Sequence, residues 1–187
     1  MSSCLDTVYL ATIMLYLSLV ILLVVSCGAF AAVSGAPWVP VFRRDLESVL
    51  DDVELKSGET LLELGCGDGR LLAAAARRGA HAVGYEINPF LVLFAKIRLL
   101  PYKNAQARFG DLWRVDTSQS DVVMTFLVPR TMPKLKRKVL REMKPGSRLV
   151  SYIFALPGVQ ATISRHHWFV YRFPLQTSKL KNHETSA

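Results

Sequence analysis

A glycine-rich turn between two apolar segments constrains the fold of this chain more than any other feature. Residues 60–64 form an apolar run that predicts a buried strand, and glycines follow it at alternate positions: Gly65, Gly67 and Gly69. Residues 70–78 then have the alanine-rich composition of a helix, which Gly79 ends. A strand that passes through glycines into a helix N-terminus predicts a cradle for a nucleotide-like ligand, because no side chains block the approach to its backbone amides.

The N-terminal region imposes a second constraint. No charged residue lies between Asp6 and Arg43, and residues 8–33 are almost wholly apolar. A membrane-spanning helix needs about 20 such residues, whereas a signal peptide has a basic start and an apolar run of about 7–15 residues. The sequence therefore predicts one transmembrane helix over residues 7–33.

The charges on either side of this span predict its orientation. Asp6 precedes it, and Arg43 and Arg44 follow it, so the positive-inside rule places the C-terminal domain on the cytoplasmic side or its equivalent. The lack of an Arg- and Ser-rich transit segment favours a bacterial plasma membrane, with a mitochondrial inner membrane as the alternative. The three cysteines cannot form a disulfide framework within one domain, which suits a reducing compartment.

The chain divides into five segments. We expect a short tail at 1–6, the transmembrane helix at 7–33, a linker at 34–42, a globular domain at 43–175 and a loose tail at 176–187. Two prolines stiffen the linker, which is too short to let the domain move far from the bilayer. Strands are expected at 60–64, 80–86, 107–109, 121–128, 147–155 and 167–173, and helices at 44–53, 70–78, 89–100 and 131–144. This alternation predicts an α/β fold: a mostly parallel, Rossmann-like sheet with helices on both faces.

Two of the expected helices have recognisable faces. The helix at 89–100 places four apolar residues on one face: Phe90, Leu93, Phe94 and Ile97. The helix at 131–144 is expected to turn five residues inward: Met132, Leu135, Val139, Leu140 and Met143. Its remaining surface would carry the basic residues Lys134, Lys136, Arg137, Lys138 and Arg141.

The positive charge of the chain is concentrated in its C-terminal part. Residues 111–187 carry thirteen basic and five acidic residues. Such a surface favours anionic lipid headgroups, nucleic acid or an acidic protein. For a chain tethered to a membrane we interpret the basic helix at 134–144 as a solvated face near lipid. A nucleic-acid partner is not expected, because no aromatic residues alternate with the charges.

Acidic residues stand at the ends of the predicted strands. The dinucleotide fingerprint is Gly-x-Gly-x-x-Gly, whereas this chain has Gly-x-Gly-x-Gly with Arg at position 70, which disfavours NAD and FAD. Glu86 ends the second strand, where a carboxylate can bind both ribose hydroxyls, and Asp111 follows the third, where it could accept from a purine amine. Asp68, in the glycine turn, would repel a pyrophosphate but suit a cation. The pattern indicates an adenosine ligand that carries positive charge, and no metal site is expected.

Several of these stretches resemble one known family. The run from Glu63 to Gly69 resembles motif I of class I S-adenosylmethionine-dependent methyltransferases, and Glu86 matches their acidic residue after motif I. Residues 84–92, 111–115 and 126–129 are similar to a membrane-anchored subfamily, which includes the lysine methyltransferases of the mitochondrial ADP/ATP carrier and of the ATP synthase c subunit. The resemblance covers roughly residues 36–157 and fades after Pro157.

The resemblance implies a cofactor and its contacts. It implies S-adenosyl-L-methionine as cofactor, bound by Glu63, Gly65, Cys66, Gly67, Asp68, Gly69, Glu86, Ile87, Asp111 and Leu112. It also implies that the methyl acceptor enters beside Phe126, Leu127, Val128 and Pro129. We interpret Cys66 as a small filler in the turn, and the histidines His81, His166 and His167 as structural, so that no general base is assigned.

The leading hypothesis is a membrane-anchored methyltransferase that acts on a lysine of a membrane protein. A lysine acceptor must lose a proton before it can attack, which an apolar entrance would favour by lowering its pKa. A methyltransferase for a lipid or quinone is the second hypothesis. A non-catalytic, membrane-anchored adapter that kept the fold is the third.

Overall fold

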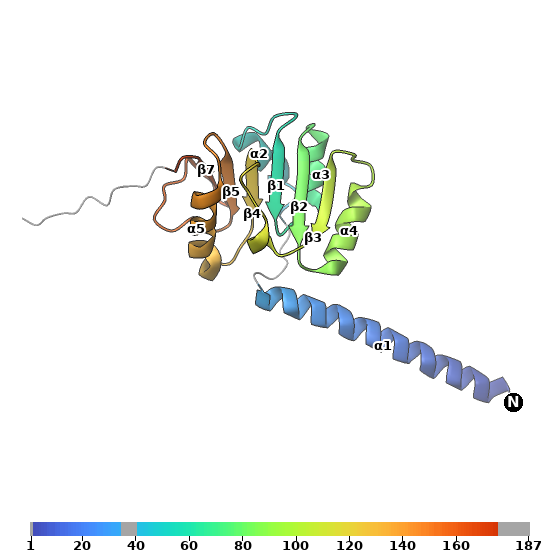
Figure 1. Ribbon diagram of the computed structural model, residues 1–187. Coiled ribbons are helices and arrows are strands. Elements are labelled where there is room, and N and C mark those ends of the chain that lie inside the picture. Colours follow the sequence, from blue (N-terminus) through green and yellow to red (C-terminus); the bar gives the residue numbers. More distant parts are fainter. Residues whose placement is uncertain (1, 35–40, 176–187) are drawn as a thin grey trace, which may run out of the picture.

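A seven-stranded sheet forms the centre of the domain in this computed structural model (Figure 1). The structure describes residues 2–34 and 41–175, and the side chains of residues 9–26 and 41–175. The sheet order is β3-β2-β1-β4-β5-β7-β6. The strands are β1 Thr60–Leu64, β2 His81–Glu86, β3 Ala105–Phe109, β4 Val122–Thr125, β5 Arg148–Tyr152, β6 Ile163–Ser164 and β7 Trp168–Arg172. The first five strands pair in parallel, and β7 is antiparallel to both β5 and β6.

Helices cover both faces of the sheet, which confirms the predicted α/β class. They are α2 Asp45–Asp52, α3 Arg70–Arg77, α4 Pro89–Leu99 and α5 Met132–Glu142, with short 3-10 helices η1 Leu112–Arg114 and η2 Pro129–Thr131. The apolar residues of α2, α3 and α4 pack with Leu61 on one face, and those of α5 pack with Leu62 on the other. Because side chains alternate along a strand, Glu63 shares the face of Leu61, beneath α3.

The order of elements agrees with the sequence prediction, whereas several boundaries differ. Strand β4 ends at Thr125 rather than at 128, and β5 ends at Tyr152 rather than at 155. The residues beyond both ends form loops at the carboxyl edge of the sheet. The two-residue strand β6 was not predicted from the sequence.

The orientation predicted for α5 was wrong at two positions. Lys138, expected on the surface, is only 6% exposed, because its ammonium lies 2.6 Å from a carboxylate oxygen of Glu142 and donates to the carbonyl of Val115. Leu140, expected to face inward, is 47% exposed. A charged residue can replace an apolar one at the buried face of a helix when a partner four residues away neutralises it.

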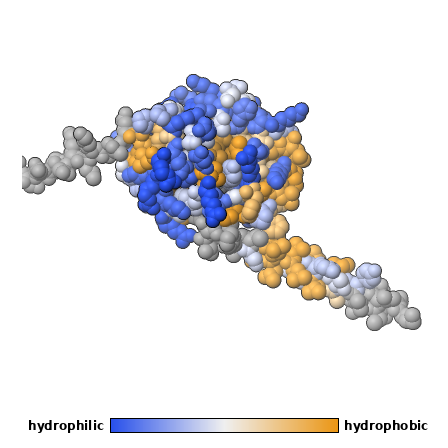
Figure 2. All heavy atoms as spheres, viewed as in Figure 1, coloured by the Kyte–Doolittle hydropathy of each residue, from blue (hydrophilic) through white to orange (hydrophobic). Residues whose placement is uncertain are grey.

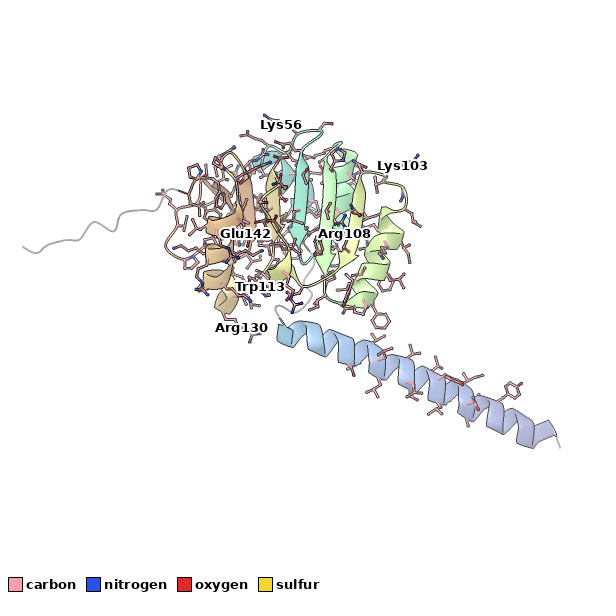
Figure 3. All side chains as sticks on the ribbon, viewed as in Figure 1. Lys56, Lys103, Arg108, Trp113, Arg130 and Glu142 are labelled. Atoms are coloured by element: carbon pink, nitrogen blue, oxygen red, sulfur yellow. The ribbon has the colours of Figure 1, made fainter. Side chains whose placement is uncertain are left out.

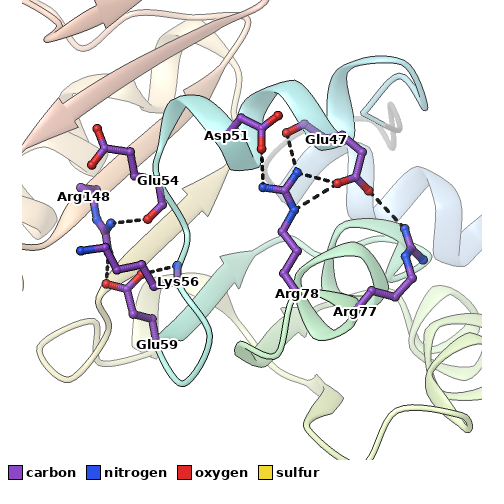
Figure 4. A network of polar contacts seen from close by, with 8 residues as sticks. All are labelled: Glu47, Asp51, Glu54, Lys56, Glu59, Arg77, Arg78 and Arg148. Carbon is purple, nitrogen blue, oxygen red and sulfur yellow. Dashed lines mark hydrogen bonds and ion pairs between the residues drawn. The ribbon is translucent and has the colours of Figure 1, made fainter.

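Two arginines fasten α2 and the loop after it to the rest of the domain (Figure 4). Arg78 of α3 pairs with Glu47 and Asp51 of α2. The buried Arg148 of β5 donates to the carbonyls of Val53 and Glu54, at 3.0 Å each, and pairs with Glu59 at 2.6 Å. These contacts hold the segment that precedes β1 in place.

Helix α1 spans Ser2–Ser34. Its segment Tyr9–Ser26 has a mean hydropathy of 2.4 and no buried residue, and among the described residues α1 is the one helix that is long and apolar enough to cross a membrane. The helix includes most of the predicted tail at 1–6. Most of the predicted linker and the whole C-terminal tail lie outside the described residues.

Candidate cofactor and acceptor site

The turn after β1 has a backbone that only glycine adopts readily. Gly65, Gly67 and Gly69 have φ values of 88°, 53° and 73°, in the left-handed region where a Cβ is strained. The amides of Gly65 and Cys66 donate to the carbonyl of Tyr85, at 2.9 and 3.0 Å. No heavy atom lies within 4 Å of the position that a Cβ on Gly65 would occupy. The turn thus leaves open space at the carboxyl end of β1.

Cys66 has the environment of a packing residue. A Cβ on Gly84 of the neighbouring strand would lie 2.5 Å from the Cβ of Cys66. Burial raises the pKa of the Cys66 thiol far above its ordinary value, and the charge of Glu63 adds to the effect. A thiol that remains protonated is a poor nucleophile, which agrees with a filler rather than a reactive cysteine.

Glu63 carries an unsatisfied carboxyl oxygen under this turn. Its side chain is buried, and its Oε2 has no hydrogen-bond partner in the described part of the chain. Burial raises the pKa of Glu63 well above its ordinary value, and the negative charges of Asp68 and Glu86 raise it further. An unsatisfied buried polar group costs about 1–3 kcal/mol. A cationic ligand in the cradle would relieve that cost, so the position fits the positively charged end of a cofactor.

Glu86 closes the cradle from the end of β2. Its carboxylate accepts from the amide of Gly67 at 3.0 Å and from the amide of Asn88 at 2.9 Å. Each oxygen of a carboxylate has a second lone pair, so the ribose hydroxyls of an adenosine could still donate to it. Asn88 caps α4 by accepting from Phe90 and Leu91, which fixes Ile87 between the strand and the helix.

Asp111 and Leu112 stand at the end of β3. One oxygen of Asp111 accepts from the amide of Trp113 at 3.0 Å and so begins the short helix η1. Leu112 and Trp113 are half-buried, and the ammonium of Lys134 lies 4.1 Å from the centre of the Trp113 ring. Leu112 and Trp113 thus offer a partly exposed apolar surface next to the Asp111 carboxylate. Such a site suits a purine ring, whose amine could donate to the carboxylate.

Asp68 has partners that account for its position without a ligand. It pairs with Arg70 at 2.8 Å and with Arg98 of α4 at 2.9 Å. Burial acts to raise the pKa of Asp68, but the hydrogen bond and charge of Arg70 outweigh it, so the pKa is lowered. The predicted contact of Asp68 with the cofactor stays a prediction, and the structure adds a role in joining α3 to α4.

The predicted acceptor entrance lies beside the glycine turn. Leu64 of β1 pairs with Thr125 of β4, and Thr125 with Ser151 of β5, so the residues that follow the three strands share the carboxyl edge. The Phe126 ring meets Tyr152 edge-on at 5.9 Å and stacks on Phe154 at 6.3 Å. Leu127 is buried, whereas Val128 is half-buried and Pro129 is exposed. Phe126 and Phe154 are half-buried, whereas the Tyr152 side chain is only 1% exposed and lies behind them. The predicted entrance therefore has an aromatic wall of Phe126 and Phe154.

Sequence reasoning missed a polar cluster behind this wall. Asp45 accepts from the Tyr152 hydroxyl at 2.6 Å and lies 2.7 Å from Nδ1 of His167. Burial acts to raise the pKa of Asp45, but these two bonds outweigh it and lower the pKa. Burial and the bond to Asp45 raise the pKa of Tyr152. Asp45 is more than a hundred positions from both Tyr152 and His167 in the sequence, so no local pattern could join them. The interpretation of His167 as a structural residue agrees with this cluster.

The carboxyl edge of the sheet (Figure 1) thus combines three features: a glycine cradle without side chains, the Glu86 carboxylate for a ribose and the unsatisfied buried carboxyl of Glu63 for a cation. This fold and site define a class I S-adenosylmethionine-dependent methyltransferase. An RNA methyltransferase from Salinibacter ruber, solved with S-adenosyl-L-homocysteine, has the same fold. Its TM-score is 0.69 at 28% sequence identity, over 73% of this chain and 94% of that one.

The model of the ANTKMT methyltransferase domain matches residues 63–163, and the chain belongs to this family. A lysine N-methyltransferase of the ATP synthase c subunit, from Rattus norvegicus, is 37% identical over 124 residues, which are 65% of this chain and 57% of the relative. A protein-lysine N-methyltransferase of Saccharolobus islandicus is 33% identical over 133 residues, which are 67% of this chain and 81% of the relative. The chain thus spans little more than half the length of the rat relative. The predicted family and cofactor are confirmed.

Proposed function

We propose that this methyltransferase is anchored in a membrane by α1 and methylates a lysine of a membrane protein. The observation that supports the acceptor class is the aromatic wall of Phe126 and Phe154 beside the glycine turn, which the buried Tyr152 backs. Apolar and aromatic surfaces hold the alkyl stem of a lysine side chain. The names of the Rattus and Saccharolobus relatives, both lysine N-methyltransferases, support the same acceptor.

Methyl transfer requires mainly that the protein position the cofactor and the acceptor relative to each other. The bound cofactor supplies an activated methyl group. The residues of this chain hold the two reactants in line, which can account for a large part of the rate. Glu86 would orient the ribose and Glu63 would neutralise the cationic end of the cofactor. The apolar rings of the entrance would favour loss of the lysine proton, because desolvation lowers the pKa of an amine. We assign no general base.

The apolar segment Tyr9–Ser26, which is long enough to cross a membrane, supports the proposed anchorage. In this proposal residues 7–33 span the bilayer, residues 34–42 link the span to the domain, and the domain at 43–175 lies on the cytoplasmic side. A site held this close to a bilayer would meet membrane proteins more often than soluble ones.

The test is transfer of a labelled methyl group from the cofactor to isolated membranes, followed by separate recovery of protein, lipid and RNA. Label in a protein band that disappears with Glu86→Ala would support the proposal. Label in the lipid extract alone would favour the lipid or quinone methyltransferase, and label in RNA would favour an activity like that of the Salinibacter structure. A folded chain that fails to bind the cofactor in calorimetry would leave only the adapter.

A further inference from the structure

Helix α4 presents an apolar face that no described residue covers. Leu93, Phe94, Ile97 and Leu100 are between 55% and 80% exposed. Figure 2 shows the hydrophobic surface on the right of the domain, where Figure 1 draws α4. Phe109, at the carboxyl end of the edge strand β3 against which α4 packs, is also exposed. We call the four residues on and just after α4 the outer face of α4.

The opposite side of the same helix is already buried. Val92, Ala95 and Leu99 pack towards the sheet, and a Cβ on Gly69 would lie 3.0 Å from the Cβ of Ala95. The helix is therefore apolar on nearly all sides. Such helices are normally enclosed by protein or by lipid, so the outer face of α4 lacks a partner.

The charges around this face show what kind of partner fits it. Residues 87–110 contain four basic residues and no acidic one: Lys96, Arg98, Lys103 and Arg108. At the angular spacing of an α-helix, Lys96 and Arg98 lie on the two sides of the stripe that contains Leu93 and Ile97. Arg98 pairs with Asp68, while Arg108 donates to the neutral groups of Tyr85 and Gln106.

A protein surface that combines an exposed apolar stripe with basic residues beside it fits the interface of an anionic bilayer, where apolar burial and electrostatic attraction add. Residues 87–110 contribute no carboxylate that would repel anionic lipid, which attracts each Lys or Arg near the surface, although Asp68, outside this segment, offsets the charge of Arg98. We propose that the outer face of α4 rests on an anionic phospholipid surface. This inference rests on the anchorage proposed above, which keeps the domain near the bilayer, and does not depend on the identity of the methyl acceptor.

The basic helix α5 fits this contact less well, although the sequence pointed to it. Several lysines on and just after this helix are engaged within the domain: Lys134 lies over Trp113, Lys136 donates to the carbonyl of Pro157 and Lys144 pairs with Asp121. Leu140 is its one large apolar residue that is exposed in the described structure. Charge without apolar area gives weak, salt-sensitive attraction and no insertion.

Docking through α4 also orients the active site. The helix connects two parallel strands and so runs alongside them (Figure 1). With the outer face of α4 on the bilayer, the strands would lie roughly in the membrane plane, and the carboxyl edge would open sideways just above the headgroups. Trp113 and Arg130 lie towards this edge, whereas Lys56 and Lys103 lie towards the other (Figure 3). An acceptor lysine close to the headgroups would then be within reach.

The test uses the whole 187-residue chain in vesicles of phosphatidylcholine, with or without phosphatidylglycerol. Cys4 and Cys27 are replaced by Ser, the buried Cys66 is kept, and a fluorescent bimane is attached through Ile97→Cys or, as the matched control, Leu140→Cys. Nitroxide-labelled lipid should quench the label at 97 several-fold more than the label at 140. Phosphatidylglycerol should increase the difference and salt should reduce it.

A second pair of variants separates docking from anchorage. Moving a Leu-sized side chain out of hydrocarbon shifts a partition equilibrium by roughly tenfold or more, so Leu93→Glu should reduce the docked fraction at least about tenfold. The matched variant Leu140→Glu should not. Both should still float with the vesicles and bind the cofactor.

Quenching at 97 no greater than at 140 would overturn the inference. Shielding of position 97 from aqueous iodide that rises with protein concentration, and not with anionic lipid, would assign the face to a second copy of the chain and would overturn it too. Failure of methyl transfer with quenching at 97 intact would count against the proposed function alone.

Discussion

Replacement of Glu63 by Gln removes a buried charge while it keeps the shape of the side chain. The folded state raises the pKa of Glu63 well above its ordinary 4.5, because burial and then the charges of Asp68 and Glu86 oppose ionisation. A raised pKa means that folding favours the proton. The contribution of protonated Glu63 to the free energy of unfolding is therefore fully present below pH 4.5 and is lost as the pH rises towards the folded-state pKa.

The size of this loss follows from proton linkage. One proton that differs between the folded and unfolded states changes the free energy of unfolding by about 1.4 kcal/mol per pH unit. Glu63→Gln has no proton to lose. Its stability relative to wild type should therefore increase at up to about this slope, from pH 4.5 until the raised pKa is reached.

The cofactor should reverse the sign of the effect. A cationic ligand beside the unsatisfied Oε2 favours the ionised carboxyl, so binding should release up to about one proton from the wild-type chain and none from this site in the Gln variant. Loss of a charged hydrogen bond worth about 1.5–3 kcal/mol should weaken binding of the cofactor roughly ten- to a hundredfold. The variant would thus be more stable and bind worse.

Urea unfolding between pH 5 and about 8 measures the first effect, and calorimetry of S-adenosyl-L-homocysteine in buffers of different ionisation enthalpy measures the second. Glu54→Gln, at an exposed residue paired with Arg172, is the control and should show neither. A difference between Glu63→Gln and wild type that is the same at every pH would refute the assignment of Glu63 as a buried, unsatisfied carboxyl.

Four further variants test the cradle and the scaffold. Glu86→Ala should weaken cofactor binding by roughly ten- to a hundredfold in calorimetry, because it removes the charged acceptor that faces the ribose and releases the amide of Gly67; unchanged affinity would mean that the site is misplaced. Arg148→Ala should lower the free energy of unfolding by about 2–4 kcal/mol in urea titrations, since it leaves two carbonyls and a partly buried carboxylate without their donor. Arg172→Ala, at an exposed pair, should cost less than about 1 kcal/mol. Burial acts to raise the pKa of Glu142, but Lys138 and Arg141 outweigh it and lower the pKa to about 2. Glu142 should therefore contribute up to about 3 kcal/mol of stability that is present above pH 4.5 and is lost as the pH falls towards 2. Glu142→Gln should reduce this loss of stability in acid, and an unchanged loss would count against the pairing of Glu142 with Lys138.

The fold and the cofactor cradle could be predicted because their signals are local. Glycines at alternate positions after a buried strand need left-handed backbone, and an acidic residue at the end of the next strand must come close to them in a parallel sheet. The positions of Gly65 and Glu86 therefore followed from spacing alone. The order of strands and helices followed from their alternation in the sequence.

The sequence placed Leu93, Phe94 and Ile97 on one face of α4, but it could not show that this face points outward, because the helix is apolar on nearly all sides. Lys138 was placed on the wrong side of α5, since an ion pair four residues along offsets the cost of burial. The Asp45–Tyr152–His167 cluster joins three distant segments and has no local signature. Each of these depends on tertiary contacts that the sequence pattern does not encode.

The central claim is tested most directly by mass spectrometry of lysine methylation in membrane proteins. Membranes are compared from cells with the gene, without it, and with the Glu86→Ala variant. We expect at least one lysine, near the headgroup level of a membrane protein, to be methylated only where the intact chain is present. A set of membrane-protein lysines with identical methylation in all three membranes would contradict the account.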